Sequence, residues 1–226
     1  ELTTYAANSF LAVKISFINE IARLADAVGA DVTEVAHGIG LDPRIGSAFL
    51  RAGAGYGGSC FPKDIAALTT LARTHETTLH VIEAADRTNE AQLDYVLAKV
   101  RPERGMRVAL LGLAFKPGTD DLRDAPALRL AERLEQFGVV VVGYDPAART
   151  LLDQKPTLEE ALRGADVAVI MTEWPEMKAM APELLTRVMQ TPRLIDGRNC
   201  WQYVDAPAGV AYEAIGRPGK EFSNKR

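Results

Sequence analysis

The apolar positions of residues 3–28 repeat with the spacing of a long helix. One stripe consists of Phe10, Phe17, Ile21, Leu24 and Val28, and a second stripe beside it of Leu11, Ile15, Ile18, Ala22 and Ala25. Two adjacent stripes make a wide apolar arc, which predicts a helix that packs against more than one neighbour. Gly29 follows and is expected to end the helix, because glycine readily adopts the left-handed backbone of a helix C-terminus.

Three further helices are predicted in the first hundred residues. Asp31, with Glu34 three positions later, resembles a capping box that starts a short helix ending near residue 40. Pro62 stands where a first helical residue is expected. Residues 78–100 contain neither Gly nor Pro and predict a helix of roughly 30 Å. Since this small helical layer is not large enough to cover both stripes, we expect a homodimer centred on residues 3–28 and this last helix.

After residue 105 the pattern changes to apolar runs separated by helix-like segments. The runs are MRVALLG (106–112), VVVVGYD (139–145), DVAVIMT (166–172) and RLID (193–196), and helices are predicted at 125–137, 158–163 and 182–189. Strands that alternate with helical crossovers predict a doubly wound parallel sheet. The expected fold class is therefore α plus α/β: an all-helical dimerisation domain (1–86), a long connecting helix (87–104) and a Rossmann-like domain (105–226).

Composition and charge exclude several classes of function. The 226 residues are 47% hydrophobic and 25% charged, as in ordinary soluble proteins, and the net charge of −4 with interspersed signs argues against a nucleic-acid-binding surface. No apolar run reaches the roughly 18 residues that span a bilayer, so no membrane association is expected. Two cysteines give no disulfide framework and favour a cytoplasmic protein, and the three histidines lack metal-ligand spacing, so no metal site is expected.

The glycine-rich stretch GAGYGGSCFPKD (53–64) has the glycine spacing of a dinucleotide-binding fingerprint but lacks the strand that should precede it. Gly53, Gly55 and Gly58 give G-x-G-x-x-G, but this fingerprint is meaningful only after a buried strand. The preceding GSAFLRA is short and lacks a β-branched run. A phosphate-binding loop is also excluded, because Ser-Cys stands where Lys-Ser/Thr is required. We therefore do not expect this loop to hold NAD.

Cys60 is the strongest candidate for chemistry. It stands just before a predicted helix start, where backbone N–H groups and the neighbouring Lys63 favour the thiolate. The glycines permit a substrate to approach closely, and a thiolate suits attack on a carbonyl carbon through a thiohemiacetal and a thioester. Asp64 follows and is a candidate to assist a water molecule or a proton transfer. The alternative is a small buried cysteine in a glycine-rich turn, and Cys200, beside Trp201, is expected to be such a packing residue.

Five ordered motifs resemble those of the nucleotide-sugar 6-dehydrogenases, most closely the branch that acts on UDP-glucose. They are ANSFLAVKISFINEIA, DPRIG, GYGGSCFPKD, GLAFKPGTDDLRDAP and DGRN, and they extend over essentially the whole chain. The resemblance is to the family's central and C-terminal domains. Because the chain also starts at Glu1 rather than Met, we expect an NAD-binding domain outside these 226 residues, and no turnover by the 226 residues alone.

The resemblance implies an NAD-dependent enzyme that oxidises the C6 alcohol of UDP-glucose to UDP-glucuronate in two hydride transfers. In this comparison Cys60 matches the nucleophile, Asp64 with its motif neighbour Lys63 matches the aspartate of the hydrolytic water network, and Asn8 matches an asparagine that holds the reacting oxygen. Arg123 matches an arginine that reaches the NAD. The implied substrate contacts are Arg44 (toward the neighbouring subunit), Phe49, Tyr56, Gly57, Phe115, Lys116 and Arg198.

The chain departs from the family's pattern at Thr4, where the family has a lysine one turn before the asparagine. A hydroxyl cannot supply the positive charge that stabilises an oxyanion. Two alternative functions therefore stay open: a dehydrogenase for GDP-mannose or N-acetylated UDP sugars, and a non-catalytic nucleotide-sugar-binding and dimerisation module. Taken singly, the arginines could also be solvated surface charges and the aromatic residues part of the core.

Overall fold

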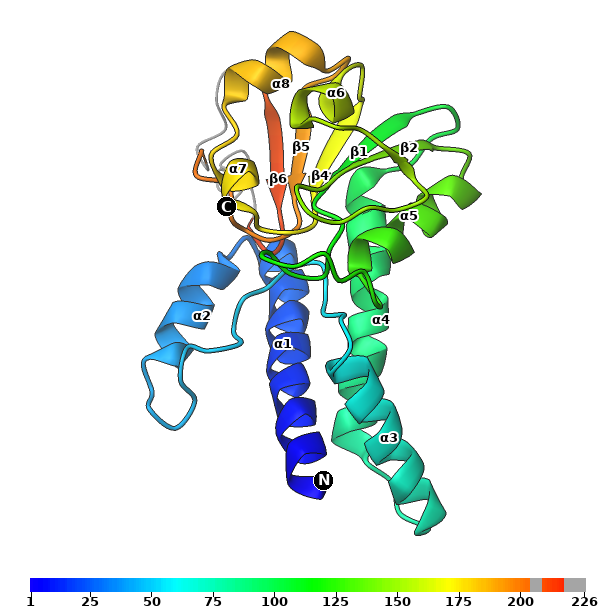
Figure 1. The fold of residues 1–226 in the computed structure, drawn as a ribbon. Helices are drawn as coiled ribbons and strands as arrows, with labels where there is room; N and C mark the ends of the chain where they lie inside the picture. Colours follow the sequence, from blue (N-terminus) through cyan, green and yellow to red (C-terminus); the bar gives the residue numbers. More distant parts are fainter. Residues whose placement is uncertain (204–208, 218–226) are drawn as a thin grey trace.

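The computed structural model describes residues 1–203 and 209–217 and divides into a helical half and a half built on a sheet (Figure 1). The final residues of the predicted 105–226 domain, from 218 on, lie outside the described residues. In the described chain the helical half contains α1 (Leu2–Val28), α2 (Val32–Gly40), α3 (Phe61–Thr74) and α4 (His80–Val100). The other half contains β1 (Arg107–Leu111), α5 (Pro126–Gln136), β2 (Val140–Tyr144), β3 (Asp153–Gln154), α6 (Leu158–Leu162), β4 (Val167–Ile170), α7 (Pro175–Lys178), α8 (Pro182–Val188), β5 (Arg193–Asp196) and β6 (Ala211–Ala214).

Local sequence signals determine where the first helices begin and end. Gly29 follows α1 in the left-handed region, with a φ of 77°, and its N–H bonds to the carbonyl of Ala25. The Asp31 side chain accepts a hydrogen bond of 2.8 Å from the N–H of Thr33 and caps α2. Pro62 lies in the first turn of α3, where a missing N–H has no cost.

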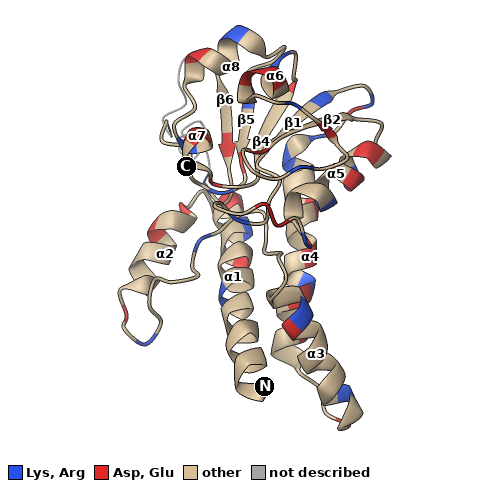
Figure 2. Ribbon diagram, in the orientation of Figure 1, with Lys and Arg blue, Asp and Glu red and all other residues tan. Residues whose placement is uncertain are grey.

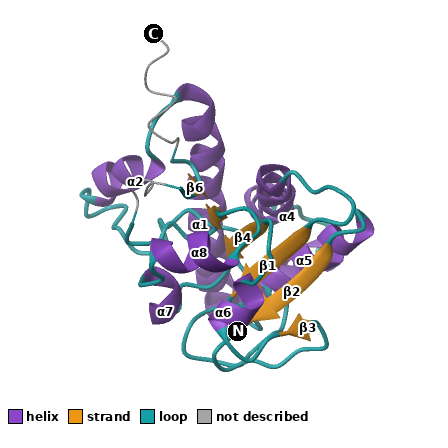
Figure 3. Ribbon diagram, turned by 90° about the horizontal axis from the view of Figure 1, so that it is seen from above, coloured by secondary structure: helices purple, strands orange, loops and turns teal. Residues whose placement is uncertain are grey.

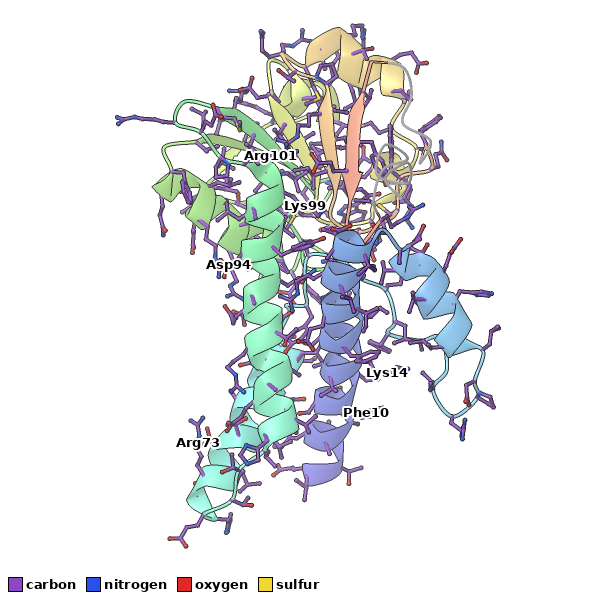
Figure 4. The ribbon with its side chains drawn as sticks, turned by 180° about the vertical axis from the view of Figure 1, so that it is seen from behind. Phe10, Lys14, Arg73, Asp94, Lys99 and Arg101 are labelled. Atoms are coloured by element: carbon purple, nitrogen blue, oxygen red, sulfur yellow. The ribbon has the colours of Figure 1, made fainter. Side chains whose placement is uncertain are left out.

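The two apolar stripes of α1 have different surroundings. The stripe that contains Ile18 is buried against α3 and α4. On the other stripe Phe10, Phe17 and Leu24 are 63%, 47% and 57% exposed. Figure 4 shows that Phe10 and Lys14 point away from α4. Among the described residues, the stripe that contains Ile18 is therefore packed, whereas Phe10, Phe17 and Leu24 of the other stripe stay exposed.

The sheet has the order β3-β2-β1-β4-β5-β6, and every pairing is parallel. Alternate residues of β1 enter opposite cores: Val108 and Leu110 pack on the side of α4 and α5, whereas Ala109 and Leu111 pack on the side of α6, α7 and α8. Helices accordingly flank both faces of the sheet (Figure 3). This arrangement confirms the predicted Rossmann-like parallel sheet.

The sequence patterns do not predict β3, α7 or β6. The first two contain two and four residues, too few for any periodicity to show. β6 has the mixed sequence AYEA and lies at the edge of the sheet, where it pairs with β5 in the register Leu194↔Tyr212. These elements form because residues that are distant in the sequence supply their hydrogen bonds and packing contacts.

The carboxyl ends of the central strands face the helical half. Ala54, which precedes α3 in the chain, donates its N–H to Gly197 directly after β5, at 2.8 Å. Gly58 donates to Arg123 in the connection after β1, at 2.9 Å. Doubly wound sheets bind ligands at this edge, near the point where the strand order reverses, here between β1 and β4. The glycine-rich loop therefore covers the edge where a ligand is expected.

Charged residues of both signs join α4 to α5. Arg129 and Arg133 on α5 form ion pairs with Glu90 and Asp94 on α4. Figure 2 shows both signs along α4, whereas residues 2–13 of α1 carry no charged side chain. Within the described ranges, no helix has both the length and the apolar character that a bilayer crossing requires.

Candidate active site

The glycines of residues 53–58 allow the loop to pack closely against the second half of the chain. A Cβ on Gly57 would lie 1.9 Å from the carbonyl oxygen of Asp124, and one on Gly53 would lie 2.9 Å from that of Gly197. Gly58 has a φ of +85° and faces the ring of Phe115, 2.7 Å from the place of a Cβ. The small size of these residues is thus required by the chain's own packing, with no phosphate needed to explain it.

The same loop is held from its other side by buried amide side chains. Asn19 on α1 accepts from the N–H of Gly53 at 2.9 Å, and Gln92 on α4 donates to the carbonyl of Gly53 at 2.7 Å. Asn89, also on α4, bonds to both backbone polar groups of Tyr56. Sequence reasoning missed these residues, although amides on the otherwise apolar buried faces of helices were a usable signal.

Cys60 occupies the N-cap position of α3 and is exposed. Its Sγ lies 3.8 Å from the hydroxyl of Ser59. The loop after β1 approaches from the sheet, and its Arg123 carbonyl accepts from the N–H of Gly58, two residues before the cysteine, at 2.9 Å. The sulfur is therefore accessible, at a helix N-terminus, and close in the chain to the contact with the Arg123 loop.

Asn8 and Asp64 form a direct contact one helical turn beyond the thiol. The amide nitrogen of Asn8 on α1 donates to Oδ2 of Asp64 on α3 at 2.6 Å. Asp64 is only 3% exposed, and its Oδ1 lies 3.4 Å from the ammonium of Lys63. Among the described residues this Oδ1 has no hydrogen-bond partner. The structure thus brings Asn8, Lys63 and Asp64 together and leaves one buried carboxylate oxygen available to a further donor.

An aromatic cluster lies beside the start of α3. The ring of Phe61, the first residue of α3, contacts Tyr56 and Phe49 edge-to-face, with centroid distances of 5.7 and 6.2 Å. Burial, and after it the charge of Asp86, raises the pKa of the Tyr56 phenol. Phe49 is 42% exposed and has a φ of 64°, which is strained for a bulky residue and typical of functional loops.

Arg44 lies on a separate arm formed by α2 and the loop that follows it. Its guanidinium pairs with Asp42 two residues earlier, at 2.5 Å, and remains largely exposed. Lys14 of α1 ties the arm down by donating to the carbonyls of Ile45 and Gly46 at 2.9 and 3.2 Å. Figure 1 shows α2 on the side of α1 opposite to α3, the helix that begins directly after Cys60.

The predicted contacts from the second half lie at the carboxyl edge of the sheet. Phe115 packs on Gly58, and the exposed Lys116 places its ammonium 5.2 Å from the Phe115 ring. Arg198 donates to the carbonyls of Met171 and Gly55 at 2.7 and 3.2 Å, so that it bridges β4 to the glycine-rich loop. Its charge is therefore held at the junction of the two halves.

Arg123 is exposed and forms a bidentate contact with Asp121 through bonds of 2.7 and 3.0 Å. These hydrogen bonds lower the pKa of Asp121 to about 2. The pair orients a guanidinium toward solvent beside the entrance to the Cys60 site.

The second half does not offer the ribose-binding carboxylate of a dinucleotide fold. That carboxylate usually stands at the end of the second strand, the place taken here by Asp145. Asp145 is buried and accepts from the N–H groups of Leu113, Ala114, Ala147 and Ala148 at 2.7 to 3.0 Å. The described residues therefore do not fit NAD at this sheet. They also contain no group of three or more His, Cys, Asp or Glu residues placed to hold a metal ion.

A cleft of about 640 Å³ opens between α3 and α4. Tyr56 and Asn89 line it together with Asp86 and Glu90, and Cys60 is not part of the lining. Burial, followed by the charge of Glu90, raises the pKa of Asp86. The cleft thus borders the glycine-rich loop at Tyr56 and lies between this loop and α4.

The chain matches known proteins over almost its whole length. Residues 1–91 match the central domain of the UDP-glucose/GDP-mannose dehydrogenase family, and residues 109–203 match its UDP binding domain. The UDP-glucose 6-dehydrogenase of Rhizobium meliloti (strain 1021) is 48% identical over 231 residues, which cover 96% of this chain and 53% of that protein. UDP-glucose 6-dehydrogenase YwqF of Bacillus subtilis (strain 168) is 43% identical over 230 residues, with coverages of 96% and 52%.

A solved structure shows the same fold. The UDP-glucose dehydrogenase of the hyperthermophilic archaeon Pyrobaculum islandicum superposes with a TM-score of 0.85 at 32% sequence identity, covering 95% of this chain and 50% of that one. The chain therefore spans about half the length of the relatives it matches.

Proposed function

The chain belongs to the UDP-glucose/GDP-mannose dehydrogenase family, and from this premise we propose that it forms the covalent-catalysis part of a UDP-glucose 6-dehydrogenase. The carrying observation is the Asn8–Asp64 hydrogen bond of 2.6 Å, one turn beyond an exposed cysteine at a helix N-terminus. The enzyme would convert the primary alcohol at C6 of UDP-glucose to a carboxylate, with two hydrides removed.

Cys60 is the proposed nucleophile. After the first oxidation, its thiolate adds to the aldehyde carbon at C6 and forms a C–S bond, giving a thiohemiacetal. Loss of the second hydride leaves a thioester, and water then cleaves the C–S bond to give the carboxylate and return the thiol. The N–H groups at the start of α3 and the nearby Arg123 favour the negative charge on sulfur at the beginning and end of this sequence.

Asn8 and Asp64 are proposed to manage water and protons during hydrolysis. Asn8 fixes one oxygen of the Asp64 carboxylate, while the other oxygen, buried and lacking a hydrogen-bond partner among the described residues, is free to accept from a water molecule. A carboxylate that accepts from water makes that water a better nucleophile toward the thioester. The ammonium of Lys63 lies 3.4 Å from the same oxygen of Asp64 and forms an ion pair with it.

NAD is the proposed hydride acceptor, and a bound nicotinamide would supply the two oxidation steps. Since the described residues do not fit a dinucleotide at the sheet, and the relatives are about twice as long as this chain, we propose that NAD is held by protein outside these residues. Arg123, exposed and oriented by Asp121, would contact it from this side.

The sugar nucleotide is proposed to bind at the carboxyl edge of the sheet, next to the glycine-rich loop that covers this edge. The match of residues 109–203 to a UDP binding domain supports this placement, as does the general position of ligands in doubly wound sheets. Phe115 and Lys116 would contact the nucleotide sugar from the sheet half. The remaining proposed contacts are Phe49, Tyr56, Gly57 and Arg198.

A homodimer is proposed to complete the site. The exposed stripe on α1 with Phe10, Phe17 and Leu24 has the seven-residue spacing of a helix-packing face. The arm that carries Arg44 contacts α1 through Lys14, and its helix α2 lies on the side of α1 opposite to α3 (Figure 1). Packing of a second copy on α1 would allow each Arg44 to reach the partner's sugar nucleotide. In this arrangement residues 1–86 are the dimerisation domain, 87–104 the connecting helix and 105–226 the nucleotide-sugar domain.

Trapping of the thioester tests the covalent proposal. In a protein that contains these 226 residues together with its NAD-binding domain, Asp64→Asn should slow hydrolysis and leave a glucuronyl mass on the peptide of Cys60 after addition of UDP-glucose and NAD. Cys60→Ala should abolish formation of UDP-glucuronate, because the second hydride is lost only from the thiohemiacetal, and Cys200→Ala, at a half-buried packing position, should not. Full turnover by Cys60→Ala would exclude the covalent route.

Thr4 is the observation that favours a second candidate, a nucleotide-sugar-binding module without catalysis. Thr4 is exposed on α1, four residues before Asn8, and carries no charge for an oxyanion. Calorimetric titration of UDP-glucose, GDP-mannose and an N-acetylated UDP sugar separates the alternatives. Binding of UDP-glucose with no NADH formed in the longer protein favours the module, and preference for another sugar nucleotide reassigns the substrate.

A further inference from the structure

Two amide side chains on α4, Asn89 and Gln92, lie behind the loop that leads into Cys60. We propose that they are positioning residues for the nucleophile: they set the path of residues 53–56 and hence the place of the thiol relative to Asn8 and Asp64. This inference rests on the proposed function of Cys60, and it gives α4 a part in catalysis.

The side-chain amide of Asn89 bonds to both backbone polar groups of Tyr56, as the backbone of a neighbouring β-strand does. Its Oδ1 accepts from the N–H of Tyr56 at 2.9 Å, and its Nδ2 donates to the carbonyl of Tyr56 at 3.1 Å. Two bonds from one rigid amide fix both the position and the orientation of a peptide unit. Asn89 is buried, and its loss removes the side-chain partner of both backbone groups.

Gln92, one turn further along α4, fixes the beginning of the same segment. Its amide nitrogen donates to the carbonyl of Gly53 at 2.7 Å, and the N–H of that residue is taken by Asn19 of α1. Gly55 is compatible with this arrangement because it lacks a Cβ, whose place is 2.8 Å from Oδ1 of Asn89. The path of the loop is therefore defined at both ends by α4.

The position of Tyr56 affects the position of Cys60 through the chain and through one ring contact. Tyr56 stands four residues before Cys60, and its ring packs edge-to-face on Phe61, the residue directly after the cysteine. A displacement of Tyr56 therefore shifts the start of α3, where the thiol lies and from which Asp64 projects one turn later. A reacting group misplaced by about 1 Å can lose roughly 100-fold in rate. Even a small shift of Tyr56 that moves the Cys60 thiol is therefore expected to slow the reaction.

α4 also connects this loop to the half of the chain that is proposed to hold the sugar nucleotide. Glu90, adjacent to Asn89, forms an ion pair with Arg129 of α5. The same helix thus contacts the nucleophile loop through its amides and the nucleotide-sugar domain through its charges.

Asn89→Ala and Gln92→Glu test the inference, with Val100→Ala as the control. Val100 is fully buried on α4, eight residues beyond Gln92, so its truncation lowers stability without removing a bond to the loop. Peptide-resolved hydrogen exchange reports the order of residues 53–58. The rate of alkylation of Cys60 by iodoacetamide reports the environment of the thiol, and neither measurement requires turnover.

Asn89→Ala should accelerate exchange of the loop peptide by about tenfold or more and change the Cys60 alkylation rate several-fold, with the β1 peptide unaffected. Gln92→Glu should do the same at pH 8, where a carboxylate cannot donate to Gly53. The ratio to wild type should fall toward one as the pH is lowered, because burial at this position raises the pKa of the new carboxyl and its protonated form can donate again. Val100→Ala should leave both ratios near one.

Loop exchange and alkylation rates within twofold of wild type for Asn89→Ala would overturn the inference, as would equal effects from Val100→Ala. In the NAD-binding form of the protein, Asn89→Ala should lower kcat by a larger factor than it raises the KM for UDP-glucose, to which the displaced Tyr56 also contributes as a proposed substrate contact. If Cys60→Ala retains turnover, the proposed function fails, whereas the exchange and alkylation results still decide whether Asn89 and Gln92 position the loop.

Discussion

Replacement of Gly57 by alanine tests how closely the two halves of the chain are packed at the site. The added Cβ would lie 1.9 Å from the carbonyl oxygen of Asp124 and 3.0 Å from Cδ of Pro126. An ordinary contact begins near 3.4 Å. The distance to Asp124 must therefore grow from 1.9 to at least 3.4 Å, about 1.5 Å, and both atoms belong to structure that is fixed by backbone hydrogen bonds.

We expect Gly57→Ala to destabilise the protein by about 1–3 kcal/mol, the cost of forcing one extra methyl group into a packed site. The lower entropy of the unfolded alanine chain offsets only about 0.4–1 kcal/mol of this. Because the loop must separate from the sheet half, the affinity for UDP should fall more than global stability alone would require. Denaturant titration measures the first effect and calorimetric titration with UDP the second.

Gly38→Ala is the matched control for this substitution. Gly38 lies within α2, and a Cβ there would meet no atom within 4 Å. The same chemical change should therefore stabilise the chain by about 0.5–1 kcal/mol through helix propensity and leave UDP binding unchanged. Wild-type stability and affinity in Gly57→Ala would refute the reasoning, since they would mean that the loop and the Asp124 carbonyl are not in contact.

Three further outcomes are expected. Asp121, whose pKa the hydrogen bonds from the Arg123 side chain and backbone lower to about 2, should titrate closer to its ordinary value of 3.8 in Arg123→Ala, which keeps only the backbone bond, as followed by NMR. Because the pKa of Asp121 is depressed in the folded state, the Asp121–Arg123 pair stabilises the loop fully above pH 3.8 and loses this effect as the pH falls through about 2. An unchanged Asp121 titration in the variant would contradict the contact. Iodoacetamide at neutral pH should modify Cys60 and spare Cys200, because Cys60 is exposed while burial raises the pKa of the Cys200 thiol; the reverse order, seen by peptide mapping, would contradict the assignment of the nucleophile. Phe17→Glu should convert a dimer to a monomer in light scattering at micromolar concentration, and a monomeric wild-type protein would remove the basis for the α1 interface.

The site divides into residues that motifs could assign and residues that only packing reveals. Cys60, Lys63 and Asp64 share one short stretch, so their neighbourhood at the start of α3 follows from helical geometry. The partner of Asp64, however, is Asn8, which lies 56 residues away, and no local pattern predicts that distance. Asn89 and Gln92, which hold the glycine-rich loop, lie in none of the five motifs, and Asn19 lies in one of them without an assigned role. The role of these amides depends on which backbone groups are left without partners after folding.

What the sequence determined by itself is the set of helices and strands whose signals are local. The spacing on α1, the cap at Asp31 and the four apolar runs of the sheet depend on neighbours within one or two turns, and they lie where the patterns predict. Tertiary structure alone decided which stripe of α1 is covered, whether β6 pairs with β5, and why Gly57 must be glycine. These features depend on atoms that are distant in the chain, and a side chain's environment there is defined only once the two halves have packed together.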